Sequence, residues 1–237
     1  MGKSTNHHIQ RKRRFLPRRA RRLVALAMAI AASLPITAFT ADIPVEEYVR
    51  QLEFSYKGVQ SLRADFSQSY EWGGRTRVET GTVTFARGGR MRWEYRDPQE
   101  KLFLSDGKQI LLYVPESKQM TRSTVKSAED IRVPFRLLLS RLDLHKVFAK
   151  IEFAEGAVEA RPGDQVLRAL PKHGDESGIH EVFMEITPQF DIQRLTVVYA
   201  DSSRMNFTFK DTEKNVRVNS AFFQFSPPPG TEVVVQK

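Results

Sequence analysis

The sequence of 237 residues contains no cysteine. Disulfide bonds, thiolate nucleophiles and cysteine-ligated metal sites are therefore excluded, and no cysteine is available for lipid attachment near the N-terminus. Long hydrophobic runs are also missing: residues 23–34 form a run of twelve apolar or small residues. A permanent transmembrane helix needs about 20 such residues, so this run is too short to be one.

Acidic residues are absent from positions 1–41, which hold nine of the 37 lysines and arginines. Subtracting those nine leaves 28 basic and 28 acidic residues in 42–237, so the net charge of +9 belongs to the N-terminus. Nucleic-acid binding, which a strongly basic chain would suggest, loses its main support. A basic stretch, a short apolar run, then Pro35 and small residues are typical of a secretory signal peptide. We predict cleavage between residues 38 and 42, general secretion to the periplasm, and one domain over 42–237.

Catalytic and metal-binding motifs are missing from the predicted exported part. Its three histidines, His145, His173 and His180, do not have the spacing of metal ligands. There is no G-x-S-x-G nucleophile motif, and the only fragment resembling a phosphate-binding loop, residues 2–4, lies in the leader. The sequence therefore predicts no enzyme, no metal and no cofactor.

Hydrophobic periodicity predicts one curved antiparallel sheet with few helices. Apolar residues at helical spacing predict a helix from Val45, with Pro44 suited to its first turn. A second, very apolar helix is expected over 134–142, and residues 116–133 are ambiguous. Period-two patterns and turn residues predict about ten strands. The segments with such patterns are 62–72, 76–85, 90–96, 102–104, 110–114, 151–154, 166–170, 181–187, 192–200, 204–210 and 221–225. The predicted fold class is mainly β (α+β), a strongly curved antiparallel sheet forming an unclosed barrel with helices on its concave side.

Aromatic residues are concentrated in the predicted strands, and phenylalanine occurs 16 times. Each of these residues taken alone is explained by a core position. Together with the apolar helix at 134–142, they are also consistent with a cavity for a hydrophobic ligand.

Five segments, in order along the predicted exported chain, resemble the LolA family of periplasmic carriers of outer-membrane lipoproteins. They are residues 62–68 (LRADFSQ), residues 85–87 leading to Trp93, residues 105–108 (SDGK) with Tyr113 and Pro115, residues 134–138 (PFRLL), and residues 223–230 (FQFSPPPG). The resemblance implies an unclosed barrel with a helical lid over an apolar cavity, and a chaperone that works as a monomer. It also implies three partners, namely acylated lipoproteins, an ATP-driven inner-membrane complex that releases them, and an outer-membrane receptor.

The resemblance also implies roles for particular residues. Arg87 would hydrogen-bond to the lid in the closed form, although Gly88-Gly89 stands where the family usually has proline after this arginine. The residues expected to line the cavity or the lid are Phe66, Met91, Trp93, Tyr95, Leu102, Leu104, Phe135, Leu138, Leu139, Phe183, Phe207 and Phe209. The alternative is a periplasmic protein of the same fold that binds another lipid or hydrophobic ligand. A regulatory domain built on this scaffold is a further alternative.

Overall fold

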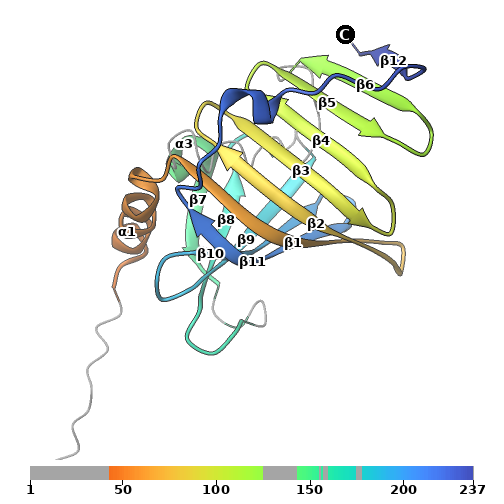
Figure 1. Ribbon diagram of the computed structural model, residues 1–237. Helices are drawn as coiled ribbons and strands as arrows, with labels where there is room; N and C mark the ends of the chain where they lie inside the picture. Colours follow the sequence, from red (N-terminus) through yellow and green to blue (C-terminus); the bar gives the residue numbers. More distant parts are fainter. Residues whose placement is uncertain (1–42, 125–142, 155, 157–159, 175–177, 237) are drawn as a thin grey trace, which may run out of the picture. The chain divides into compact units, whose positions relative to one another are not determined.

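The computed structural model describes residues 43–124, 143–154, 156, 160–174 and 178–236. Within this part of the chain, twelve strands form one sheet in the order β12-β6-β5-β4-β3-β2-β1-β11-β10-β9-β8-β7 (Figure 1). Every neighbouring pair is antiparallel except β12 with β6. The strands are β1 (Ser61–Trp72), β2 (Arg75–Ala86), β3 (Arg90–Asp97), β4 (Lys101–Asp106), β5 (Gln109–Val114), β6 (Gln119–Thr124), β7 (Phe148–Phe153), β8 (Gln165–Pro171), β9 (Ile179–Ile186), β10 (Ile192–Tyr199), β11 (Arg204–Lys214) and β12 (Glu232–Val235).

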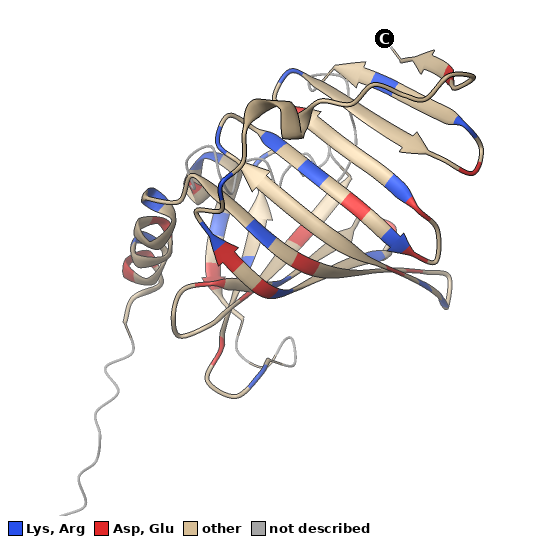
Figure 2. Ribbon diagram, in the orientation of Figure 1, with Lys and Arg blue, Asp and Glu red and all other residues tan. Residues whose placement is uncertain are grey.

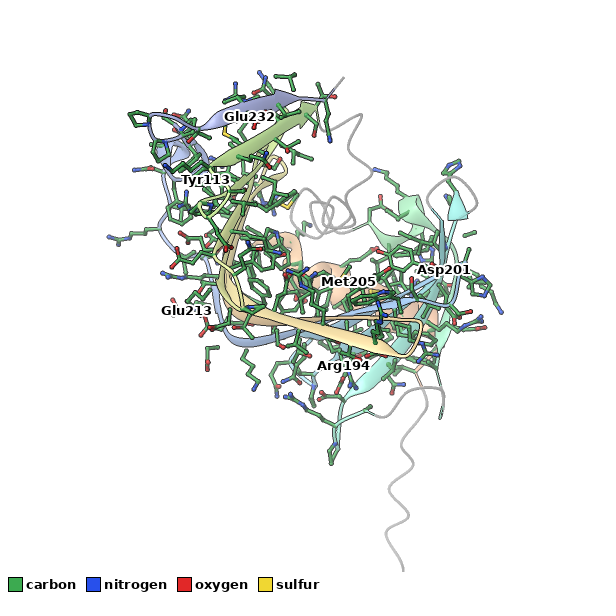
Figure 3. The ribbon with its side chains drawn as sticks, turned by 90° about the vertical axis from the view of Figure 1, so that its right-hand side faces the viewer. Tyr113, Arg194, Asp201, Met205, Glu213 and Glu232 are labelled. Atoms are coloured by element: carbon green, nitrogen blue, oxygen red, sulfur yellow. The ribbon has the colours of Figure 1, made fainter. Side chains whose placement is uncertain are left out.

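The predicted fold class is confirmed: the described strands form an antiparallel sheet that is strongly curved and not closed. β7 and β12 are its two edges. Viewed from the end, the sheet bends into a trough, with Tyr113 and Glu232 on one wall and Asp201 on the other (Figure 3). Met205 lies inside the trough and Tyr113 on its outer side (Figure 3). The sheet therefore has a concave and a convex face, and strand periodicity decides which side chains reach each face.

The predicted first helix is confirmed as α1 (Val45–Lys57), with Pro44 at the position before its first turn. Glu46 and Glu47 in that first turn and Lys57 in the last suit the helix dipole. The helix buries Tyr48, Val49, Leu52 and Tyr56, which share one face because Leu52 is four and three residues after the first two and Tyr56 is four residues further on. The described chain also contains the short helix α3 (Leu144–Val147) and the 3-10 helix η2 (Ser220–Phe223).

Three expectations about the strands were wrong or incomplete. Residues 221–225 were predicted as a strand, but Ser220–Phe223 form η2, because the Asn219 side chain accepts a hydrogen bond from the backbone N–H of Phe222. The ambiguous residues 116–133 include strand β6. Residues 232–235, for which no strand was expected, form β12.

Charged residues of both signs are mixed over the strands (Figure 2). This distribution agrees with the equal numbers of acidic and basic residues in 42–237. Residues 43–237 form one compact unit. In the part of the chain that the structure describes, no helix has the length and apolar character needed to cross a membrane. The predicted signal peptide, residues 1–41, and the predicted helix at 134–142 lie outside the described residues.

Candidate functional site

The concave face carries a cluster of aromatic side chains centred on Trp93. This residue is fully buried, and its ring centroid lies 4.8 Å from that of Phe66 and 5.5 Å from those of Phe85 and Phe207. The cluster forms because β3, β2, β1 and β11 are consecutive neighbours in the sheet and each contributes alternate residues to the same face. We call it the concave cluster. It consists of Phe66, Phe85, Met91, Trp93, Tyr95, Phe103, Phe207 and Phe209.

Six of the residues expected to line the cavity lie together in this cluster. They are Phe66, Met91, Trp93, Tyr95, Phe207 and Phe209, each 6 % exposed or less. Phe103 belongs with them because it pairs with Trp93 across β3 and β4 and shares its face. The sequence did not identify Phe103, because its neighbours Leu102 and Leu104 are also apolar. The strand therefore shows no alternation of apolar and polar residues from which its inward face could be predicted.

Three other expected residues are on the opposite face of the sheet. Leu102 and Leu104 pair with Glu94 and Arg92, not with Trp93, and pack in a separate cluster against which Phe225 lies. Phe183 packs in a third cluster with Val166 and Val198. These three side chains cannot reach the concave face, because neighbouring residues on a strand point to opposite sides.

Phe135, Leu138 and Leu139 lie outside the described residues. The lid that these residues were expected to form is therefore not part of the described site.

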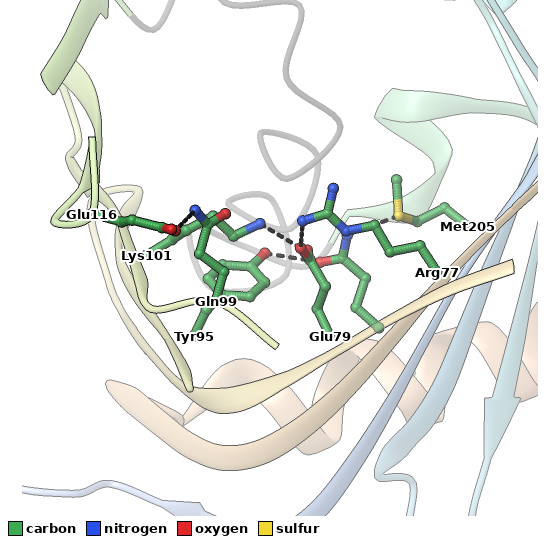
Figure 4. Close-up of polar contacts among 8 residues, drawn as sticks. Arg77, Glu79, Tyr95, Gln99, Lys101, Glu116 and Met205 are labelled. Carbon is green, nitrogen blue, oxygen red and sulfur yellow. Dashed lines mark hydrogen bonds and ion pairs between the residues drawn. The ribbon is translucent and has the colours of Figure 1, made fainter. Parts of the chain in front are cut away.

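A buried polar group adjoins the aromatic residues at one end of the concave face (Figure 4). The Glu79 carboxylate, whose side chain is 8 % exposed, is 2.6 Å from Lys101 Nζ and 2.7 Å from Arg77 Nη2. The Tyr95 hydroxyl donates to Gln68 Oε1 over 2.8 Å, and Gln68 Nε2 donates to Met205 Sδ over 3.0 Å. Lys101 Nζ also lies 4.5 Å from the centroid of the Tyr95 ring. The site is thus a buried apolar cluster with a defined polar end.

Arg87 lies directly after β2 and bonds to the end of α1. Its Nε donates to the carbonyl oxygen of Val59 over 2.9 Å, and its Nη2 donates to the carbonyl oxygen of Lys57. These carbonyls belong to the last turn of α1 and the residues just after it, where backbone acceptors lack helical partners. Arg87 therefore ties the sheet to the C-terminal end of α1.

Tyr56, in the last turn of α1, fixes the helix to the start of β10. Its hydroxyl oxygen accepts a hydrogen bond from the backbone N–H of Ile192 over 3.0 Å. Burial raises the pKa of Tyr56 to about 12, with a smaller contribution from Asp191, so the hydroxyl stays neutral at physiological pH. Tyr48 contacts the rings of Phe153 and Phe190, with centroids 5.5 and 5.1 Å away. The helix is thus held against the second half of the sheet by buried contacts.

No group of three or more His, Cys, Asp or Glu side chains suited to hold a metal ion occurs among the described residues. The described site is made of apolar side chains with polar groups at one end.

An open antiparallel sheet with an apolar concave face defines a class of proteins suited to enclosing hydrophobic ligands. A family model, described as outer membrane lipoprotein carrier protein LolA, matches residues 57–226, and the chain belongs to this family. An outer-membrane lipoprotein carrier protein of Bordetella avium is 31 % identical over 217 residues, covering 90 % of this chain and 96 % of the relative. One of Dechloromonas aromatica is 30 % identical over 189 residues, covering 78 % of this chain and 86 % of the relative. An uncharacterized conserved protein of Thermus thermophilus has a similar fold, with a TM-score of 0.52, 11 % sequence identity, and coverage of 81 % of this chain and all of that one.

Proposed function

We propose that this protein is a periplasmic chaperone that binds the acyl chains of lipoproteins and carries them to the outer membrane. The observation that carries the proposal is the concave cluster, a set of buried apolar side chains on the inner face of a sheet that is not closed. Membership of the LolA family and the names of the curated relatives support this cargo. Binding, not catalysis, is the activity that these residues supply.

The cargo explains why the site is apolar and why a carrier is needed. Moving acyl chain out of water is worth about 0.8 kcal/mol per buried methylene. A lipoprotein with several chains therefore does not leave a membrane unaided. A carrier that bound these chains as tightly as a membrane does could not release them, so loading must be driven and release must be downhill.

Arg87 supports a way to keep release favourable. Each hydrogen bond from its guanidinium to the end of α1 has a net worth of about 1 kcal/mol. If α1 and the lid must move to admit cargo, these bonds are broken on loading and reformed on release. We propose that Arg87 is a latch that favours the cargo-free state. Loading then needs an energy source, and the ATP-driven inner-membrane complex is the proposed one.

The direct test of the carrier function adds the purified protein to spheroplasts that are making lipoproteins. We expect newly made lipoproteins to appear in the soluble fraction, bound to the protein, and to pass on to an outer-membrane receptor. If no lipoprotein is released while the protein binds a free fatty acid or another lipid, the alternative of a carrier for a different hydrophobic ligand is favoured.

The latch is tested by Arg87→Leu. We expect the variant to fold and to bind lipoprotein but to transfer little of it. Without the latch, the cargo-free state is no longer favoured over the loaded state, so release of the cargo is less favourable. Arg75→Leu removes an exposed arginine from the tip of the β1–β2 hairpin and serves as the matched control. Transfer by Arg87→Leu at the rate of the parent protein would exclude the latch and leave the carrier function standing.

A further inference from the structure

An open pocket of about 810 Å³ has none of the concave-cluster residues in its lining. Its walls come from the end of α1, the start of β1, the end of β2, the start of β3 and residues 215–219, which follow β11. Hydrogen bonds fix two of these walls to each other. The backbone N–H of Gln60 donates to Asn215 Oδ1 over 2.8 Å, and the Ser61 hydroxyl donates to the carbonyl of Val216 over 2.6 Å.

Three arginines line this pocket, namely Arg87, Arg90 and Arg217, and none of the described residues in its lining is acidic. This is an unusual concentration of positive charge, because residues 42–237 hold equal numbers of acidic and basic residues, 28 of each. None of the three arginines forms an ion pair with a carboxylate of the described chain, whereas Arg77, Arg168 and Arg194 all do. Like charges in one pocket without a counter-charge are unfavourable, and an anion would relieve the repulsion.

The three side chains keep N–H groups available for such an anion. Arg90 uses its Nε on the carbonyl of Arg87, 3.0 Å away, and its guanidinium lies 5.3 Å from the centroid of the Phe223 ring. Arg87 uses Nε and Nη2 on the end of α1. Arg217 is exposed. The stacking and hydrogen bonds hold two of the guanidinium groups in place before any ligand arrives, which reduces the entropy lost on binding.

We propose that this pocket binds a phosphate group. The planar fork of an arginine pairs with two oxygens at once, and several arginines together suit the tetrahedral set of oxygens on phosphate better than the two oxygens of one carboxylate. The pocket is far larger than inorganic phosphate, so it has room for a phosphate that is part of a lipid headgroup. A phospholipid headgroup and free phosphate share the chemistry that the pocket recognises.

Because Arg87 bonds to the end of α1, phosphate binding in the pocket would also affect the contact between β2 and α1. The Arg87 guanidinium bonds to the end of α1 and also faces the anion pocket. A phosphate bound beside it offers a charged partner in place of neutral carbonyls, and charge-assisted hydrogen bonds are about twice as strong as neutral ones. Occupation of the pocket would therefore loosen the contact between β2 and α1.

The test measures binding of two probes by the purified protein at low salt. The first is inorganic phosphate, followed by calorimetry, and the second is vesicles of phosphatidylcholine with one-fifth phosphatidylglycerol, followed by flotation. We expect Arg217→Gln to weaken binding about tenfold, as removal of one charge-assisted contact should, and Arg90→Gln/Arg217→Gln to weaken it further. Arg75→Gln, which removes the same charge outside the pocket, should bind like the parent protein.

Each outcome decides the proposal. Vesicle binding without phosphate binding assigns the pocket to lipid headgroups, and phosphate binding without vesicle binding assigns it to free phosphate. Failure to bind either probe, equal losses in Arg217→Gln and Arg75→Gln, or binding only to an acidic peptide such as polyglutamate would overturn it. Thermal unfolding of each variant shows whether the fold is intact. Neither probe is a lipoprotein, so the result is independent of the carrier function.

Discussion

At position 81 the chain has no side chain, and the neighbouring strand occupies the space that one would fill. A Cβ atom built there would lie 2.1 Å from the carbonyl oxygen of Glu94 and 2.9 Å from the Phe66 ring. Gly81 is the partner of Phe66 on one side and of Tyr95 on the other. Glycine at this position therefore allows the aromatic residues of the concave cluster to close over the backbone of β2.

We expect Gly81→Ala to lower the free energy of unfolding by about 1–3 kcal/mol, the usual cost of overpacking. Gly58→Ala is the control, because a Cβ there meets nothing within 4 Å and the backbone φ of −89° suits alanine. That variant should be unchanged or more stable by about 0.4–1 kcal/mol. Urea unfolding of both proteins measures the difference. Equal stability of the two variants would show that β2 and β3 can move apart without cost.

The sequence predicted the concave residues of β3 but not those of β4, for a reason visible in single residues. Met91, Trp93 and Tyr95 alternate with charged residues, so their common face could be predicted. In β4 the residues Leu102, Phe103 and Leu104 are all apolar, because the sheet is covered on both faces at that point. Only the pairing of Phe103 with Trp93 decides which of them reaches the concave face.

At the scale of elements, the sequence did not predict the role of the segment that follows β11. It places η2 and the following residues against the convex face of β3, β4 and β5, where Phe225 contacts Tyr113 with ring centroids 4.9 Å apart. Arg92 reinforces this contact, since its Nη1 donates to the carbonyl of Phe222 over 3.2 Å. The aromatic residues at 222–225 resemble a strand in composition, but here they cover a sheet that is already formed.

We expect Phe223→Ala to destabilise the protein by about 3–5 kcal/mol, because the side chain is 1 % exposed and its loss leaves a cavity. Phe222 precedes it and is only partly buried, so Phe222→Ala provides a control of the same chemistry with a smaller expected loss. Thermal unfolding of both variants measures the contrast. If the two losses are the same, η2 does not anchor the C-terminal segment through Phe223.

For the whole molecule, the charge is divided unequally between residues 1–41, the predicted leader, and residues 42–237. Residues 1–41 carry all of the net charge of +9, and the domain has a formal charge of zero. We expect isoelectric focusing to separate a strongly basic precursor from a nearly neutral periplasmic form, whose first residue, found by N-terminal sequencing, lies between 39 and 42. A chain made directly from residue 42 is the control. A periplasmic form that focuses with the precursor would mean that the leader is retained.

The sequence by itself determined the class of fold, most of the strands, the first helix and the likeness to lipoprotein carriers. These follow from local periodicity, turn residues and short motifs, which act within a few residues of the chain. Tertiary structure alone decided that Phe103 faces inward and Leu102 outward, that Glu79 is buried between Lys101 and Arg77, and that Arg87, Arg90 and Arg217 meet in one pocket. Those arrangements depend on the register and curvature of the sheet, which bring together residues far apart in the sequence.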